Sequence, residues 1–84
     1  MNEEETVGFV KSRDEALIHF VRTGKMDQVE AHCEKYGVKL PKDERIRKAA
    51  LYKAVQRCTD IPDEIKSLAA MECMKLGFSP FMHV

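Results

Sequence analysis

The sequence lacks the features that would place it outside the cell or within a membrane. No apolar run approaches the roughly 20 residues of a membrane-spanning helix. Its three cysteines are an odd number with no C-x-x-C pair, whereas small secreted domains usually carry an even set of disulfides. The start, Met1-Asn2-Glu3-Glu4-Glu5, is acidic where a secretory signal is basic and then apolar. We therefore expect a cytoplasmic protein with no membrane partner.

Catalytic and metal-binding motifs are also missing. There is no glycine-rich phosphate loop, no G-x-S-x-G, no H-E-x-x-H and no cluster of carboxylates. His19 and His83 have no partner at a metal-ligand spacing, while His32 and Cys33 are neighbours that point about 100° apart on a helix. We expect no enzyme activity, no catalytic residue, no metal and no cofactor.

What the chain does contain is the composition of one small globular domain. Of its 84 residues, 44% are hydrophobic and 33% are charged. A formal net charge of zero hides a gradient along the chain. Residues 1–15 hold five acids and two bases, whereas residues 42–58 hold six bases and two acids. Only this second block is basic enough to suggest an anionic partner.

Caps, stops and hydrophobic periodicity predict four helices and no strands. Ser12-Arg13-Asp14-Glu15 has the form of a capping box, Gly37 is a C-terminal stop, and Pro62 suits a first helical turn. The predicted helices cover residues 13–23, 26–36, 43–58 and 62–76. They form a domain over 12–77, between an acidic, partly ordered segment 1–11 and an apolar tail 78–84.

The expected fold is all-α, a four-helix array of two tandem αα hairpins. Two segments of the chain are similar, Cys33-Glu34-Lys35-Tyr36-Gly37-Val38 and Cys73-Met74-Lys75-Leu76-Gly77-Phe78. Either an internal repeat or coincidence would explain this similarity. The cysteines fall at apolar positions and are expected to be small core residues. The predicted core is Leu17, Phe20, Val29, Cys33, Ile46, Ala50, Ala54, Ile65, Leu68 and Leu76.

Part of the sequence resembles known helical repeats. Leu17-Ile18, Gly24, Asp27, Val29, Tyr36-Gly37-Val38 and Pro41 follow the order seen in a tetratricopeptide- or pentatricopeptide-type unit, and residues 74–80 are similar to the end of such a unit. The resemblance implies helix-hairpin geometry, in families that bind peptides or single-stranded RNA along a concave face. The run 47–62 and the ending 76–81 also look like small uncharacterised proteins of bacterial mobile elements or prophages.

The basic segment 43–58 offers one candidate binding surface. On a helical wheel, Arg45, Lys48, Tyr52 and Lys53 lie on or beside one strip opposite the apolar stripe. Cations interleaved with an aromatic ring suit a phosphate backbone and a stacked base. The same strip would also be an ordinary solvated face, and the balanced total charge is unusual for a nucleic-acid binder.

Glu72 and His32 offer a second candidate. Glu72 falls between Leu68 and Leu76 on the apolar side of its predicted helix, where a charge is costly unless it is paired. Facing His32, it would form an acid–base couple or two ligands of a metal. In the alternative, Glu72 lies at the rim of the stripe beside a lysine or arginine, and His32 is exposed to solvent.

A surplus of apolar residues near the end of the chain offers the third candidate. Methionine and phenylalanine adapt well to a partner surface, so their clustering favours a protein–protein contact. The tail would alternatively fold back over the thin core. The preferred function is a non-catalytic interaction or adaptor protein that binds another protein or itself as a homodimer, and the alternative is a nucleic-acid-binding regulator. The expected contact residues are Met71, Met74, Phe78, Phe81 and Met82.

Overall fold

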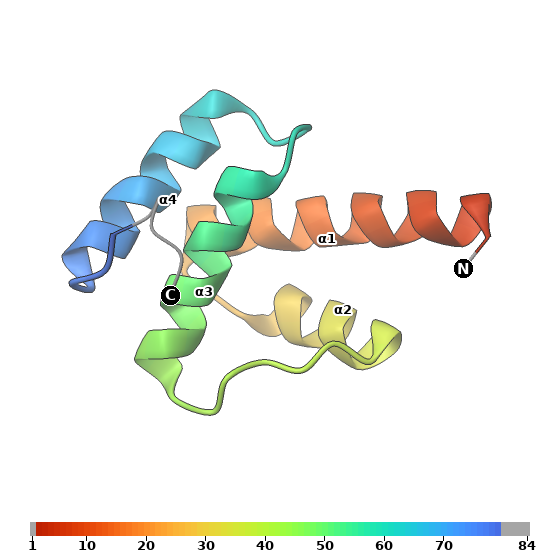
Figure 1. Cartoon of the computed structure of the whole chain (residues 1–84), viewed down its shortest axis with the longest axis horizontal. Coiled ribbons are helices and arrows are strands. Elements are labelled where there is room, and N and C mark those ends of the chain that lie inside the picture. Colours follow the sequence, from red (N-terminus) through yellow and green to blue (C-terminus); the bar gives the residue numbers. More distant parts are fainter. Residues whose placement is uncertain (1, 80–84) are drawn as a thin grey trace.

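A computed structural model describes residues 2–79 of the chain, which form four helices and no strand. Figure 1 shows them in chain order. The predicted class, all-α with four helices, is therefore confirmed. No helix in the described part of the chain combines the length and the apolar character needed to cross a membrane. The helices are α1 (Glu3–Thr23), α2 (Asp27–Tyr36), α3 (Glu44–Arg57) and α4 (Asp63–Lys75).

The start of α1 was predicted wrongly. Asn2, rather than Ser12, is the N-cap, and its Oδ1 accepts a hydrogen bond from the Glu5 N–H at 2.8 Å. Three acidic residues in the first turn then suit the positive end of the helix dipole. Phe9 holds this early part of the helix in place by packing against His32 and Tyr36 of α2. The apparent capping box therefore lies inside a helix that starts ten residues before residue 13.

The other helices begin and end within one residue of their predicted bounds. Asp43 caps α3 by accepting a hydrogen bond from the Ile46 N–H at 2.9 Å. Beyond α4, Gly77 has φ +89°, the Gly77 N–H donates to Met74 O, and the Phe78 N–H donates to Cys73 O. This pairing is a Schellman motif, which needs the left-handed conformation that glycine adopts without strain. The motif turns the chain back at Phe78.

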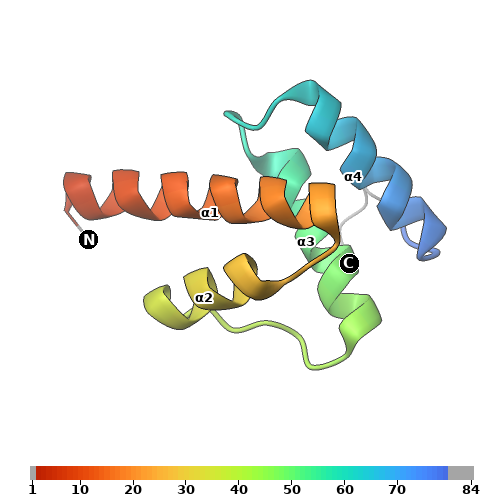
Figure 2. The ribbon, with the colours of Figure 1, turned by 180° about the vertical axis from the view of Figure 1, so that it is seen from behind.

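The most extensive packing joins α1 to α2 and α3 to α4, while α1 also contacts α3 and α4. Among the described residues, α2 and α4 do not pack on each other. Figures 1 and 2 show the N-terminal half of α1 reaching beyond α3 and α4, with α2 beside it. The long helix α1 therefore links the two pairs.

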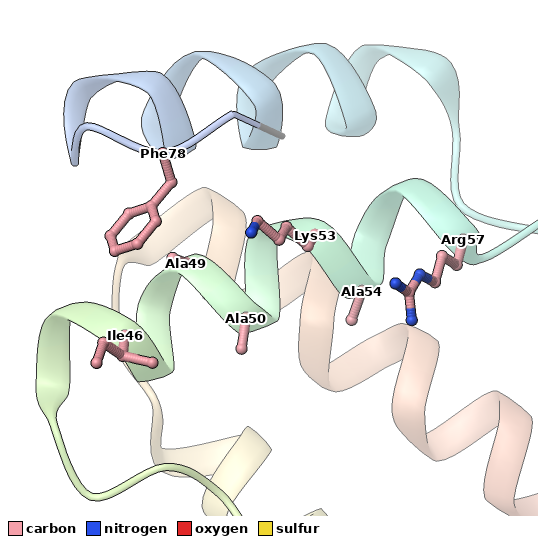
Figure 3. Close-up of a pocket in the computed structure, with 7 residues that line it drawn as sticks. All are labelled: Ile46, Ala49, Ala50, Lys53, Ala54, Arg57 and Phe78. Atoms are coloured by element: carbon pink, nitrogen blue, oxygen red, sulfur yellow. The ribbon is translucent and has the colours of Figure 1, made fainter. Parts of the chain in front are cut away.

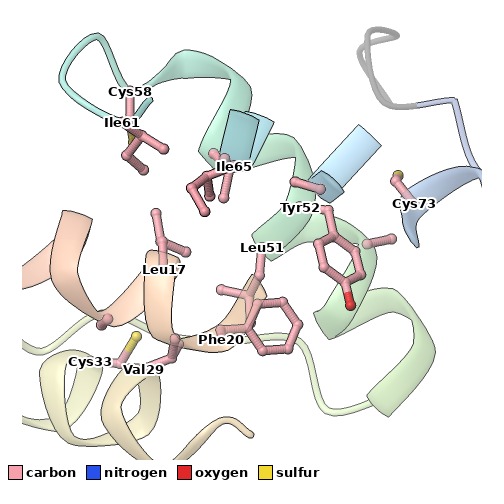
Figure 4. Close-up of a cluster of buried hydrophobic side chains, with 14 residues drawn as sticks. Leu17, Phe20, Val29, Cys33, Leu51, Tyr52, Cys58, Ile61, Ile65 and Cys73 are labelled. Carbon is pink, nitrogen blue, oxygen red and sulfur yellow. The ribbon is translucent and has the colours of Figure 1, made fainter. Parts of the chain in front are cut away.

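The core lies between α1, α3 and α4 and extends to α2 through Val29 and Cys33 (Figure 4). Phe20 of α1 is fully buried, and its ring centroid lies 4.9 Å from that of Tyr52 of α3 at an interplanar angle of 30°. Five predicted core residues are buried, and Ala54 and Leu76 are half-buried. The five buried ones are Leu17, Phe20, Val29, Cys33 and Ile65.

The buried face of α3 differs from the predicted one. Ile46 is 50% exposed and Ala50 is exposed, whereas Tyr52 is 6% exposed. Two of the three core residues predicted on α3 are alanines, Ala50 and Ala54, and burying one tyrosine ring removes more apolar area from water than burying two methyl groups. The helix is therefore rotated so that the ring points inward. The buried residues of α3 are Ala49, Leu51, Tyr52 and Val55.

Candidate functional site

The outer side of α4 carries the largest concentration of exposed apolar side chains in the described chain. Leu68, Met71 and Met74 are 41%, 51% and 57% exposed, and we call these three residues the α4 strip. The opposite side of the same helix holds Ile65, Ala69 and Cys73, which are buried against the core. Those three residues join α4 to the core, and the α4 strip takes no part in that packing.

A polar rim surrounds the α4 strip. Glu64, Ser67 and Lys75 are all exposed and lie on the same outer side of α4. The Lys75 ammonium donates a hydrogen bond to Glu72 Oε1 at 3.1 Å, and both side chains reach solvent. An apolar centre with a charged rim is the arrangement found at many protein interfaces.

Leu68 belongs to this surface although the sequence placed it in the core. The predicted core took Ile65, Leu68 and Leu76 from this helix, a wider arc than α4 buries. The helix packs on α3 and α1 from one side only, so Leu68 at the edge of that arc stays 41% exposed. Its position three residues before Met71, on the same side of the helix, is the signal by which the sequence could have placed it on this surface.

Phe78 does not join the two methionines. The turn at Gly77 directs it back onto α3, where it is half-buried. The Arg45 guanidinium lies 4.8 Å from the centroid of its ring, and the Lys53 ammonium lies 5.6 Å from it. Cations at these distances are attracted to the face of the ring. Phe78 therefore helps to fix the end of α4 on α3, and the predicted contacts Phe81 and Met82 lie outside the described residues.

A shallow pocket of about 350 Å³ lies along α3 beside Phe78 (Figure 3). Alanine side chains line much of it, and Lys53 and Arg57 contribute the positive charge. Its lining combines one residue predicted to contact a protein, Phe78, with one predicted to contact nucleic acid, Lys53. The lining residues are Ile46, Ala49, Ala50, Lys53, Ala54, Arg57 and Phe78.

The predicted basic strip of α3 is divided in the structure. Tyr52 is buried against Phe20 and is not available to stack on a base, because its ring packs better inside than on the surface. The Arg45 guanidinium donates hydrogen bonds from Nε (2.9 Å) and Nη2 to the Leu76 carbonyl oxygen. The Lys48 ammonium lies 3.5 Å from Glu44 Oε1 on the same helix. Much of the strip therefore takes part in contacts within the chain.

The structure does not pair His32 with Glu72. They lie on α2 and α4, which do not pack on each other. His32 is 8% exposed rather than solvated, and its Nδ1 lies within hydrogen-bond distance, 2.8 Å, of Ser12 Oγ. Burial lowers the pKa of His32, and the positive charges of Arg13 and Lys35 lower it further. Glu72, half-buried at the edge of α4, bonds Lys75 instead.

A second pocket, of about 240 Å³, lies between α1, α2, α3 and the linker before α3. Its walls are mostly apolar, with Leu40 on one side. Two of its polar lining groups are already engaged, since Arg13 binds Asp14 at 3.0 Å and His32 bonds Ser12. These pairings favour a packing gap over a ligand site.

The three cysteines are buried free thiols, as expected for small core residues. Burial raises the pKa of Cys33, Cys58 and Cys73, so the thiols resist ionisation. Within residues 2–79, no three His, Cys, Asp or Glu side chains lie close enough together to hold a metal ion.

Comparison of the chain with protein-family models, with curated proteins and with solved structures finds no match.

Proposed function

We propose that this chain is a non-catalytic protein–protein interaction module that binds its partner through the α4 strip. The observation that carries the proposal is the exposure of Leu68, Met71 and Met74 on one side of a helix whose other side is fully packed. Apolar surface gains about 25 cal/mol for each Å² removed from water, so a partner that covers these side chains gains stability. Methionine adds adaptability, because its unbranched side chain can fit several surface shapes.

The rim around the strip supports specific docking. Glu64 and Lys75 place opposite charges at the two ends of α4. Such exposed charges set the orientation of a partner more than its affinity. An adaptor role in the cytoplasm agrees with three thiols that are all free, since a reducing compartment keeps cysteines in this state.

The nucleic-acid alternative receives less support from the geometry. It needed Tyr52 as a stacking platform, and that ring is buried. It also needed Arg45, whose guanidinium holds the end of α4. Of the four residues proposed for it, Lys48 and Lys53 remain, and two half-buried lysines are a small electrostatic footprint.

The test of the interaction proposal is the double substitution Met71→Ser/Met74→Ser. Both side chains are more than half exposed, so we expect the urea midpoint of the variant to stay close to that of the wild type. If the partner is a second copy of the chain, the variant should lose self-association, measured by light scattering. If the partner is another protein, the variant should lose binding to a protein that the wild type retains from a cell extract.

Val7→Ser is the matched control. Val7 is 62% exposed on α1, so the control removes a similar exposed apolar group far from the α4 strip. We expect Val7→Ser to keep every association that Met71→Ser/Met74→Ser loses. If the folded methionine variant keeps the same associations as the control, the α4 strip is not the binding surface.

A further inference from the structure

The exposed face of α4 has the spacing of a helix-pairing seam. Glu64, Leu68, Met71 and Lys75 are separated by four, three and four residues, and all four are exposed. This is the spacing by which one helix packs along another at a shallow angle. Figure 1 shows α4 at the edge of the molecule, with α3 on its inner side and no described helix on its outer side.

The order of residues in this seam is complementary to itself. If two copies of α4 pair antiparallel about the midpoint between Ala69 and Ala70, each residue faces the one equally far beyond that midpoint. Leu68 of one copy then faces Met71 of the other, and Glu64 faces Lys75. A two-fold axis repeats each contact, so two apolar pairs lie between two pairs of opposite charge. A parallel arrangement would instead place like charges side by side.

The existing bond of Lys75 does not prevent this pairing. Its ammonium binds Glu72 of the same helix at 3.1 Å, and the side chain remains 66% exposed. An ammonium has three donors, so it can bind a carboxylate of its own helix and one of a second copy. Met74 lies beside the seam, 57% exposed, and would cover one flank of the paired helices.

We infer that the partner of the α4 strip is a second copy of this chain, joined by antiparallel pairing of α4 with α4. The inference rests on the proposed function and names the partner of that surface. Residues 64–75 span only about 17 Å of helix, so the contact is well below the roughly 1,600 Å² of a standard interface. The dimer is therefore weak and reversible, and it is populated at high protein concentration.

The decisive experiment exchanges the charges at the two ends of the seam. Glu64→Lys places two lysines opposite each other at both ends of the dimer, and Lys75→Glu places two glutamates there. We expect each single variant to raise the dissociation constant of the dimer about tenfold, because attraction becomes repulsion at both ends of the dimer. The double variant Glu64→Lys/Lys75→Glu restores opposite charges and should dimerise like the wild type.

Mixing the two single variants gives the most specific readout. In a heterodimer of Glu64→Lys with Lys75→Glu, both ends carry one acid facing one base. We expect the equimolar mixture to dimerise about as tightly as the wild type, while each variant alone is mostly monomeric. Sedimentation velocity between about 10 μM and 1 mM covers the expected range of a weak dimer.

Circular dichroism and urea unfolding separate pairing from folding. Each substitution puts an unfavourable charge at an end of α4, so a folding defect would be worst in the double variant. Restored dimerisation in that variant therefore supports the pairing. Met71→Ser, which leaves both charges in place, should also abolish the dimer with the fold retained.

Three outcomes would overturn the inference. A wild type that stays monomeric up to 1 mM does not pair with itself. If Met71→Ser/Met74→Ser then loses binding to a different protein, the proposed function stands while this inference fails. If the charge variants dimerise as tightly as the wild type, the two copies pair through a surface other than α4. The antiparallel arrangement is excluded if the double variant dimerises more weakly than both single variants and the mixture of the two single variants forms no dimer.

Discussion

Arg45 at the start of α3 binds the carbonyl oxygen of Leu76 at the end of α4, 31 residues further along the chain. The carbonyls at the end of a helix have no partner within it and carry partial negative charge, which a guanidinium can satisfy. The ring of Phe78 packs against the same guanidinium, with its centroid 4.8 Å from Arg45 Cζ. One surface arginine thus adds to the core packing that holds the end of α4 on α3.

Replacing Arg45 with alanine should destabilise the fold by about 1–2 kcal/mol, because the hydrogen bonds to Leu76 and the contact with Phe78 are lost together. Arg45→Lys keeps the charge but loses the planar fork, and it should recover only part of the loss. Urea unfolding measures the effect. Lys42→Ala, an exposed cation just before α3, is the control and should change the free energy of unfolding little. Equal stability of the two alanine variants would contradict the structural role of Arg45.

Gly77→Ala should lower the free energy of unfolding by about 1–2 kcal/mol, because the residue has φ +89° and a Cβ atom would lie 2.8 Å from Arg45 Nη2. Gly8→Ala provides a control of opposite sign. It lies within α1, where a Cβ would meet Tyr36 Oη at an ordinary 3.7 Å, so it should stabilise by about 0.5–1 kcal/mol. Thermal unfolding should therefore shift in opposite directions for the two variants.

Tyr52→Ala should cost about 3 kcal/mol, since it removes a buried ring stacked on Phe20 and leaves a cavity in a thin core. Tyr52→Phe keeps the ring and should stay within about 1 kcal/mol of the wild type. Urea titrations followed by far-UV circular dichroism distinguish the two. A Tyr52→Ala variant as stable as the wild type would place this side chain on the surface, as the sequence first suggested.

Lowering the pH from 7.5 to 5.5 should weaken the fold through His32. Its pKa lies below the ordinary 6.5 in the folded chain, so the unfolded chain takes up a proton first as the pH falls. The stability that His32 contributes is present above pH 6.5 and is lost as the pH falls through the lower folded pKa. His32→Asn, which can still bond Ser12, should lose less stability over this range. Equal losses in the two proteins would mean that His32 is not the titrating group.

The buried thiols should weaken the fold at alkaline pH. Cys73 is fully buried and its pKa is raised above the ordinary 9.0, so the unfolded chain ionises first as the pH rises. This contribution is intact below pH 9 and is lost as the pH climbs through the folded pKa. Cys73→Ala should show a smaller fall in stability between pH 8 and 10. A disulfide reagent at pH 8 should react with the native thiols at the rate of unfolding, and rapid reaction would contradict their burial.

The helix ends followed from the sequence where a local rule had no competitor. Gly37 and Gly77 follow the ends of helices, at positions where the backbone has a positive φ that glycine adopts without strain. Asp43 caps the start of α3 through its own side chain. Ser12 misled the prediction because serine in a helix-start pattern can equally serve a tertiary hydrogen bond. Its hydroxyl lies against His32, a residue on a different helix, and no local pattern indicates that partner.

By itself, the sequence determined the all-α class, the bounds of α2, α3 and α4, and the exposed methionines of α4, since backbone conformation and helical periodicity depend on neighbouring residues. Only the tertiary structure decided which side of α3 is buried, because that choice depends on how much apolar area α1 and α4 cover together. The same packing buries Tyr52, places the Arg45 guanidinium where it donates hydrogen bonds to the Leu76 carbonyl oxygen, and leaves Leu68 exposed beside Met71. The α4 strip is thus an apolar surface that the packing of α4 on α1 and α3 leaves uncovered.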